Sequence, residues 1–415
     1  MKRVVITGLG AITPIGKNVK QYWENLLKGI SGANKITRFD ASKFKTQFAC
    51  EIKDYDALDY FDRKEARKLD RFSQYGLISA EEAIKDANLD FSKLDTNRIG
   101  VIFSSGIGGF ETFEKEIIDY TNGNFNPRFN PFFIPKIISN GLSGIISINN
   151  GLRGVNYCPV TACASSTQSI IQSFNYIRLG KADIIIAGGS EAPITESSIG
   201  GFNAMKAMST NNENFSSASK PFDTNRDGFV VGEGAGALII ESLDSALKRN
   251  ANIYAEIVGG GESSDAYHIT GTHPEGLGAY LAMENGIKEA KITPNEIEYI
   301  NAHATSTGLG DLSEIKAIER LFKSSIEKVQ ISASKSMTGH LLGGTGAIEA
   351  ISTCLSVKTD LIPLTINTTE IDKNIPKELN LSLGETSSKK VNYALSNSFG
   401  FGGHCSAMIL KKYVG

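Results

Sequence analysis

The sequence predicts an α/β fold in which covered, largely parallel sheets alternate with helices. Short apolar, β-branched runs recur along the chain, and each ends in Gly, Ser or Ala. Between them lie segments with the apolar spacing of a helix, and no low-complexity tract or Pro-rich linker divides the chain. Strands that alternate with helices are typical of parallel sheets that are covered on both faces.

Five of the apolar runs fit buried strands. The first runs into what reads as a glycine turn, and the others repeat its pattern. These five runs cover residues 3–10, 98–106, 182–190, 235–242 and 297–304.

Two of the intervening stretches have clear helical character. Residues 63–88 are predicted as one helix. The second covers residues 165–180, with Ile170, Phe174 and Ile177 at helical spacing and Gly180 as its C-cap.

The segment around residue 250 resembles the beginning of the chain. A helix end is followed there by a fresh strand and a run of glycines, "IYAEIVGGGESSD". This echo predicts two similar halves, residues 1–250 and residues 251–415.

Composition bounds the function. The chain has 415 residues, of which 41% are hydrophobic and 21% charged, so a sizeable core is expected. A net charge of −2 gives no general attraction to nucleic acid or to an anionic membrane. Five irregularly spaced cysteines do not form a secreted disulfide scaffold, and the N-terminal apolar run is too short for a signal peptide. We therefore expect a cytoplasmic protein that binds neither nucleic acid nor membrane.

The sequence contains incomplete matches to several cofactor-binding and metal-binding motifs. Residues 8–13, "GLGAIT", begin like a dinucleotide fingerprint, but Thr13 stands in place of the third glycine. Residues 223–234 imitate a calcium loop, but Gly234 occupies the position of the closing carboxylate. The histidines are scattered singly, so Cys158 and Cys163 lack the partners of a zinc site. We expect no cofactor and no catalytic metal.

Cys163 has the setting of a reactive thiol. It lies where a short strand turns directly into a helix, and the unpaired N–H groups and dipole of a helix start favour thiolate and lower the thiol pKa. Cys158 precedes a proline on the strand, so packing is its expected role. A buried structural cysteine is the alternative for Cys163.

Two histidines strengthen the catalytic interpretation. His303 ends a predicted strand and is followed by hydroxyl residues, while His340 shares a small-residue loop with Lys335. Strand ends are where α/β proteins assemble active sites. Either histidine alone is more often structural, but together with Cys163 they favour a site with a cysteine nucleophile.

Five segments resemble the successive signatures of the β-ketoacyl-[acyl carrier protein] synthases, and most of all the elongating type II enzymes of the thiolase superfamily. The resemblance implies a thiolase-like, five-layered αβαβα fold with two duplicated halves, usually as a homodimer. It implies an acyltransferase of fatty-acid elongation that condenses an acyl chain on Cys163 with malonyl-acyl carrier protein, releasing CO2, without a cofactor. The segments are "TACASS", "KPFDTNRDGFVVGEGAGALIIE", "NAHATSTGLGD", "SKSMTGHLLGGTGA" and "NSFGFGGH".

The resemblance also assigns roles to residues. Cys163 matches the acyl-accepting nucleophile, and His303 and His340 match the two catalytic histidines. The backbone N–H of Phe401 matches the group that forms the oxyanion hole together with the N–H of Cys163. The remaining matches are an ordering pair (Lys335 and Glu349), acyl-pocket residues (Ile107, Phe202 and, reaching across the dimer, Phe133), pantetheine contacts (Thr305 and Thr307), and the ligands of a structural monovalent cation found in some members (Asn301, Glu349, Ser396 and Asn397).

A basic stripe suggests where the carrier protein docks. Lys64, Arg67, Lys68 and Arg71 fall on one face of the helix predicted for residues 63–88, opposite an apolar face. A solvated basic face is the alternative, but the resemblance favours docking of an acidic acyl carrier protein, with Lys206 joining the surface.

The sequence departs from the family pattern at three positions, Ala304 for glycine, Gly308 for proline and Cys405 for asparagine. We expect Cys405 to be a packing residue, and a second oxidisable thiol is the alternative.

Three other functions compete with this interpretation: a ketosynthase of a polyene or polyketide pathway, a thiolase acting on coenzyme A, and a non-catalytic chain-length subunit. A thiolase would want a second catalytic cysteine near the C-terminus, and the chain-length subunits typically lack the nucleophile that Cys163 supplies.

Overall fold

A bent sheet of eleven strands forms the centre of this computed structural model, which describes residues 1–415 apart from the side chain of Ser324. Hydrogen bonds join the strands in the order β12-β10-β9-β14-β15-β8-β1-β7-β6-β4-β5. The strands are β1 (Val4–Ile12), β4 (Ile99–Ser104), β5 (Asn156–Tyr157), β6 (Ile184–Glu191), β7 (Gly234–Ser242), β8 (Ala255–Ser264), β9 (Tyr299–Asn301), β10 (Gln330–Ser332), β12 (Asn380–Leu381), β14 (Tyr393–Gly400) and β15 (His404–Lys411).

The sheet repeats one topology on either side of the β1–β8 pair. Outward from β1 the order is β7, β6, β4, β5, and outward from β8 it is β15, β14, β9, β10. In both halves the first two pairings are antiparallel and the next two are parallel. This repeat is the duplication expected from the resemblance, while the exact boundary at residue 250 stays a prediction.

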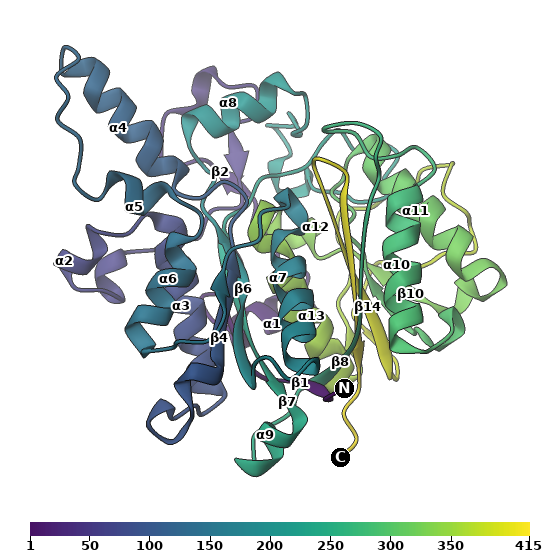
Figure 1. The fold of residues 1–415 in the computed structure, drawn as a ribbon. Coiled ribbons are helices and arrows are strands. Elements are labelled where there is room, and N and C mark those ends of the chain that lie inside the picture. The colour runs from purple at the N-terminus through teal and green to yellow at the C-terminus, as the bar shows by residue number, and fades with distance from the viewer.

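Five layers result from the way helices cover this sheet (Figure 1). Helices α3 and α6 cover the outer face of the first half, α10 and α11 cover that of the second half, and α7 and α13 lie between the halves. The predicted five-layered αβαβα arrangement is therefore confirmed. The layer helices are α3 (Arg71–Asp86), α6 (Gly141–Asn150), α7 (Ser165–Arg178), α10 (Leu277–Ala290), α11 (Gly308–Phe322) and α13 (Thr345–Thr359).

The remaining elements are short or peripheral. Two small antiparallel ladders pair β2 with β3 and β11 with β13. Helices α4 and α5 project from the body as an arm (Figure 1). These elements are β2 (Asn34–Lys35), β3 (Phe48–Ala49), β11 (Leu361–Ile362), β13 (Ser387–Ser388), α1 (Val19–Leu27), α2 (Arg63–Ala66), α4 (Phe110–Asn122), α5 (Phe133–Ile137), α8 (Glu196–Ala204), α9 (Leu243–Lys248) and α12 (Lys335–Thr338).

The prediction of a largely parallel sheet was wrong. Antiparallel pairs join β1 to β7 and β8, β6 to β7, and β15 to β14 and β8. Strands that are covered on both faces read as continuous apolar runs whatever their direction, so the sequence pattern could not distinguish the two cases.

The glycines of residues 8–13 lie inside β1 and not in a turn. A Cβ on Gly10 would come within 1.9 Å of the Ser79 carbonyl oxygen of α3. The equivalent strand of the second half behaves alike, because a Cβ on Gly261 would come within 1.8 Å of the Ala282 carbonyl oxygen of α10. The glycine runs of the two halves therefore let a covering helix approach the sheet closely.

The helix predicted for residues 63–88 is broken. It consists of α2 and α3, and the break falls at residues 67–70. The Asp62 side chain caps α2 through the N–H groups of Lys64 and Glu65, and the Asp70 side chain accepts the N–H of Phe72 and begins α3. Asp70 also accepts the hydroxyl of Thr112, which fixes the start of α3 against α4. The second N-cap explains the break.

Candidate active site

Cys163 lies in a strained turn at the start of the central helix α7. The turn is a 3-10 segment, Ala162–Ala164, and Ala162 takes the left-handed φ of 50°. The Ser165 hydroxyl accepts the N–H of Thr161 and donates to the carbonyl of Ala162, which holds the turn closed. Non-glycine residues rarely adopt this conformation, and such strain is concentrated at functional sites.

The pKa of the Cys163 thiol is not lowered as the sequence led us to expect. Burial raises it to about 12, and the ammonium of Lys335 and the backbone N–H groups of Phe401 and Cys163 offset only part of this rise. The helix start was correctly located, but the desolvation of a buried thiolate outweighs its effect. Cys158 lies just beyond β5 and is partly buried, and its thiol pKa is also raised by burial, to about 11.

Two backbone N–H groups lie close enough to the Cys163 side chain to favour its thiolate. They belong to Cys163 itself and to Phe401, which follows β14. Gly400 allows this approach, because a Cβ there would lie 2.5 Å from the Thr161 carbonyl oxygen. The pair has the composition of an oxyanion hole, as the resemblance implied.

His303 and His340 face one another across the same cavity. Their ring centroids are 5.4 Å apart and the rings are nearly perpendicular. His340 Nδ1 lies 3.0 Å from the hydroxyl of Thr345, while Nδ1 of His303 has no partner among the described residues. Burial lowers the pKa of both imidazoles well below the usual range, so both rings are neutral near pH 7.

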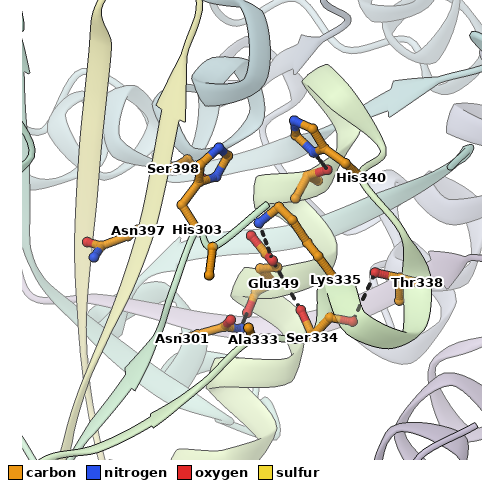
Figure 2. Close-up of polar contacts among 12 residues, drawn as sticks. Asn301, His303, Ala333, Ser334, Lys335, Thr338, His340, Glu349, Asn397 and Ser398 are labelled. Atoms are coloured by element: carbon orange, nitrogen blue, oxygen red, sulfur yellow. Dashed lines mark hydrogen bonds and ion pairs between the residues drawn. The ribbon is translucent and has the colours of Figure 1, made fainter. Parts of the chain in front are cut away.

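A buried ion pair lies beneath the two rings. Lys335 Nζ is 2.7 Å from Oε1 of Glu349, and both side chains are almost completely buried. Figure 2 shows Lys335 extending toward Glu349 below the imidazoles of His303 and His340. The same carboxylate oxygen accepts the hydroxyl of Ser334. Because Lys335 begins α12, which leads into His340, this pair anchors the segment that presents the second histidine.

Glu314 positions His303 through its backbone. This buried carboxylate of α11 accepts the N–H groups of His303 and Ala304 and the side-chain amide of Asn397. Sequence reasoning missed Glu314. No helix was predicted for residues 308–322, so the burial of this carboxylate on α11, which requires fixed partners, was not foreseen.

Four buried oxygen atoms without hydrogen bonds coincide with the positions that the resemblance assigned to a monovalent cation. They are Oδ1 of Asn301, Oε2 of Glu349, Oγ of Ser396 and Oδ1 of Asn397. The amide nitrogens of Asn301 and Asn397 are directed elsewhere, toward α13 and toward Glu314. A set of amide, hydroxyl and carboxylate oxygens suits a hard cation, so the residues fit such an ion.

The structure brings nine of the predicted residues, among them the nucleophile and both histidines, to one cavity of about 540 Å³. Its wall includes Thr305 and Thr307, whose hydroxyls lie 3.0 Å apart, and the exposed Lys206 stands at its edge. The predicted residues on this wall are Ile107, Cys163, Phe202, Lys206, His303, Thr305, Thr307, His340 and Phe401.

Other predicted residues lie away from the cavity. Phe133 belongs to the projecting arm, where it stacks on Phe113 and Phe129 and does not line the cavity of its own chain. Lys64, Arg67 and Lys68 are exposed on and just after α2. Arg67 and Lys68 lie in the break between α2 and α3, and Arg71 of the predicted stripe begins α3 and pairs with Glu111, so these cations do not form one face of a continuous helix.

Comparison with known families decides the identity of the fold. The family described as beta-ketoacyl synthase, N-terminal domain, matches residues 1–246, and its C-terminal domain matches residues 254–369. The chain belongs to the β-ketoacyl synthase family. It is 48% identical over 415 residues to 3-oxoacyl-[acyl-carrier-protein] synthase 2 of Staphylococcus aureus (strain COL), covering 99% of both chains. It is 45% identical to the synthase 2 of Synechocystis sp. (strain ATCC 27184 / PCC 6803 / Kazusa), covering 99% of this chain and 98% of that relative.

Solved structures of β-ketoacyl synthases share the fold. The β-ketoacyl synthase from Burkholderia phymatum STM815 has a TM-score of 0.92 and 32% identity over the full length of both chains. A ketosynthase solved with its type II PKS acyl-carrier protein and bound to a hexaketide has the same TM-score and identity, covering 99% of this chain and 100% of its own.

This β-ketoacyl synthase accommodates its three departures from the family pattern. Ala304 is buried and gives its N–H to Glu314. Gly308 begins α11 in open space, with no atom within 4 Å of an added Cβ. Cys405 lies buried on β15, opposite Ser263 of β8 and Phe399 of β14, and its side chain reaches the cavity wall. Burial raises the pKa of this thiol, which supports a packing role for Cys405.

The described part of this β-ketoacyl synthase contains neither a carboxylate, histidine or cysteine cluster for a metal nor a membrane-spanning helix. Within the described part of the chain, no three or more His, Cys, Asp or Glu side chains are placed to hold a metal ion. None of the described helices combines the length and the apolar character needed to cross a bilayer.

Proposed function

We propose that this chain is a 3-oxoacyl-[acyl carrier protein] synthase that elongates fatty acyl chains. The observation that carries the proposal is that Cys163, His303 and His340 line one cavity, with the N–H groups of Cys163 and Phe401 close to the thiol. The higher identity to the synthase 2 relatives than to the solved polyketide ketosynthase favours fatty-acid elongation over a polyketide pathway.

The first half-reaction acylates Cys163. The thiol loses its proton, its sulfur attacks the carrier thioester carbonyl, and the carrier leaves as a thiol that takes up a proton. The two backbone N–H groups stabilise the negative charge that develops on the carbonyl oxygen, an effect worth about 3 kcal/mol for each donor.

The second half-reaction forms the carbon–carbon bond. Malonyl carrier protein loses CO2, and the electron pair left behind forms an enolate at its thioester carbonyl. Neutral His303 and His340 can each donate an N–H to this oxygen; a hydroxyl proton of Thr345 directed to Nδ1 of His340 leaves the imidazole proton on Nε2. The enolate carbon then attacks the acyl group, and the Cys163 sulfur leaves, giving 3-oxoacyl carrier protein.

Mass spectrometry after incubation with acyl carrier protein thioester tests this proposal. We expect one acyl group on Cys163, and its discharge when malonyl carrier protein is added. Cys163→Ala should remove the adduct, whereas Cys158→Ala, five residues away, should keep it. An adduct on Cys158 would contradict Cys163 as the nucleophile, and no adduct at all would favour a non-catalytic chain-length subunit.

We also propose that the chain works as a homodimer. The arm formed by α4 and α5 exposes Phe113, Ile118, Phe125 and Ile134 by 44% or more of their accessible area, a patch that is unusually apolar for free surface. A second copy that covers this arm would bring Phe133 toward its cavity, as the resemblance implied. Sedimentation of the purified chain should give a dimer, and a monomer would contradict this arrangement.

A monovalent cation and an acidic partner complete the proposal. The cation would be held by Asn301, Glu349, Ser396 and Asn397, where it would fix β9, β14 and α13 without taking part in the chemistry. Replacing sodium and potassium by tetramethylammonium should then lower the unfolding temperature, and an unchanged temperature would contradict the site.

The partner is acyl carrier protein, docking at Lys64, Arg67, Lys68 and Lys206. A cytoplasmic location rests on the five free cysteines, which suit a reducing compartment.

A further inference from the structure

Glu191 is a fully buried carboxylate that the proposed mechanism does not use. It ends β6 and accepts four hydrogen bonds. Oε1 accepts the hydroxyl of Ser105 at 2.7 Å and the N–H of Ile107 at 3.1 Å. Oε2 accepts the N–H of Gly106 at 2.7 Å and that of Gly343 at 2.9 Å. All four partners are donors, so the ionised carboxylate is the form that satisfies them.

These four donors belong to two walls of the cavity that come from different halves of the chain. Residues 105–107 follow β4, and Gly343 follows His340 and Leu342 on the way into α13. Gly106, Ile107, His340 and Leu342 all line the cavity. The carboxylate is closely enclosed, because a Cβ on Gly106 or Gly343 would lie 2.8 or 2.7 Å from its Oε2.

The same charge acts on the nucleophile. Glu191 raises the pKa of the Cys163 thiol, an effect smaller than those of burial and of Lys335. A negative charge near the sulfur would disfavour the thiolate, so the residue is not selected to activate Cys163. Its hydrogen bonds to the two walls provide the more direct explanation for its presence.

We propose that Glu191 is a positioning residue that holds the Ile107 wall of the cavity against the Gly343 wall and so sets which acyl chains reach Cys163. The inference deepens the proposed function and rests on it, because it assumes that the cavity receives the acyl chain. A side chain that fixes Ile107 through its backbone N–H determines the depth of the cavity without touching the substrate itself.

Glu191→Gln tests the proposal selectively. The amide oxygen can keep the two N–H groups at the Oε2 position, and the hydroxyl of Ser105 can turn to accept from the new NH2 group. The N–H of Ile107 then faces a donor and loses its acceptor. The rate of Cys163 acylation is measured with acyl carrier thioesters of increasing chain length. We expect the ratio between the rates of the best and the worst acyl chain to fall about tenfold in the variant.

The pH profile of Cys163 alkylation is a second readout, which tests the charge of Glu191 beside the sulfur separately from its hydrogen bonds to the two walls. Loss of the negative charge lowers the pKa of the thiol, so iodoacetamide should alkylate Glu191→Gln faster than wild type at the same pH. Glu241→Gln is the matched control, since Glu241 is an equally buried carboxylate on β7 whose partners, Thr7, Ser245 and Arg249, lie off the cavity wall. It should change neither the chain-length preference nor the alkylation profile.

Ser105→Ala keeps the proposal falsifiable if Glu191→Gln does not fold. It removes one donor to Glu191 and the acceptor of the Gly108 N–H but retains the charge. We expect the chain-length preference to fall about threefold with an unchanged alkylation profile. A folded Glu191→Gln that keeps the chain-length preference of wild type, or a Ser105→Ala with an unchanged preference, overturns the positioning role whatever the alkylation profile shows. A wild-type chain that forms no acyl adduct on Cys163 overturns the proposed function instead.

Discussion

Opposing influences act on the thiol of Cys163. The start of α7, two N–H groups and Lys335 favour the thiolate, while burial and the charge of Glu191 disfavour it. Burial is the largest of these effects, so the thiol pKa is about 12 in the free site. The cysteine is therefore held mostly as a protected thiol, and its reactivity depends on N–H groups that stabilise charge once the substrate carbonyl arrives.

This balance predicts the pH dependence of Cys163 alkylation. Only the thiolate reacts, so below the pKa the rate rises about tenfold with each pH unit. With the pKa near 12, the rate should still be rising at about pH 10, whereas an ordinary thiol would approach its plateau there. Iodoacetamide rates from about pH 6 to 10, read by mass spectrometry on the Cys163 peptide, measure this. A half-maximal rate at or below about pH 8 would contradict the raised pKa and would support the lowered thiol pKa that the helix start alone predicts.

Single residues could be predicted when their chemistry is carried by the local sequence. Cys163 is marked by a strand-to-helix turn, and His303 and His340 are marked by strand ends and small-residue loops. Glu191 and Glu314 could not be singled out in this way. Glu191 accepts backbone N–H groups from segments far from it in sequence, and Glu314 accepts those of residues ten and eleven positions earlier; only the fold shows that these segments meet the two carboxylates.

Among the elements, α11 shows how a departure from the family pattern can be tested. Its first helical residue is Gly308, and the preceding Thr307 has φ −102° and ψ 146°. Those angles suit a residue that precedes proline, and proline is favoured at the first position of a helix. The space around Gly308 is open, and the N–H of Gly308 donates no hydrogen bond to any described residue.

Gly308→Pro should therefore stabilise the protein. The substitution restricts the unfolded chain without straining the folded one, which adds about 0.4–1 kcal/mol to the free energy of unfolding. Chemical denaturation at a fixed protein concentration measures this. Gly308→Ala is the control that removes glycine's flexibility without the proline ring. A lower free energy of unfolding for Gly308→Pro would contradict this prediction and would mean that residue 308 adopts a backbone conformation that proline cannot.

Elements were predicted well in kind and less well in detail. The long buried strands and helix α7 follow directly from apolar periodicity. The direction of the strands did not, because both faces are covered and no alternation marks an open face. The break between α2 and α3 was visible only as Asp70, a capping residue inside an otherwise helical pattern.

At the scale of the whole molecule, the duplication explains why the site lies where it does. Helices α7 and α13 form the central layer, and each begins with a 3-10 turn entered through a left-handed residue, Ala162 and Leu342. The two turns contact one another, which places Cys163 and the loop after His340 on a common cavity. The sequence predicted two halves and the residues that each contributes, whereas the meeting of their helix starts depends on the topology of the sheet.

The exposed cations around the cavity form the proposed docking surface for acyl carrier protein. Lys64, Arg67 and Lys68 lie on and after α2, and Lys206 stands at the cavity edge just after α8. The Nζ atom of Lys68 also lies 5.7 Å from the ring centre of Phe132 on the projecting arm. The chain as a whole carries a net charge of only −2, so attraction to an acidic carrier must come from such local groups.

Reversing two of these charges should weaken carrier docking without impairing the chemistry. We expect Lys64→Glu with Arg67→Glu to raise KM for acyl carrier protein about tenfold at low salt, since rim charges act mainly on encounter. Acylation of Cys163 by a small acyl-pantetheine thioester, which needs no protein docking, should be unchanged. The matched control is Lys85→Glu with Lys248→Glu, which makes the same change in net charge at two other exposed lysines, the second on α9 at the opposite end of the molecule from α8 (Figure 1). Salt should narrow the difference between the two double variants, because exposed charges are screened over about 10 Å at 0.1 M. If both pairs raise KM equally, or if the small thioester is impaired as well, these cations are a solvated surface and the carrier protein docks elsewhere.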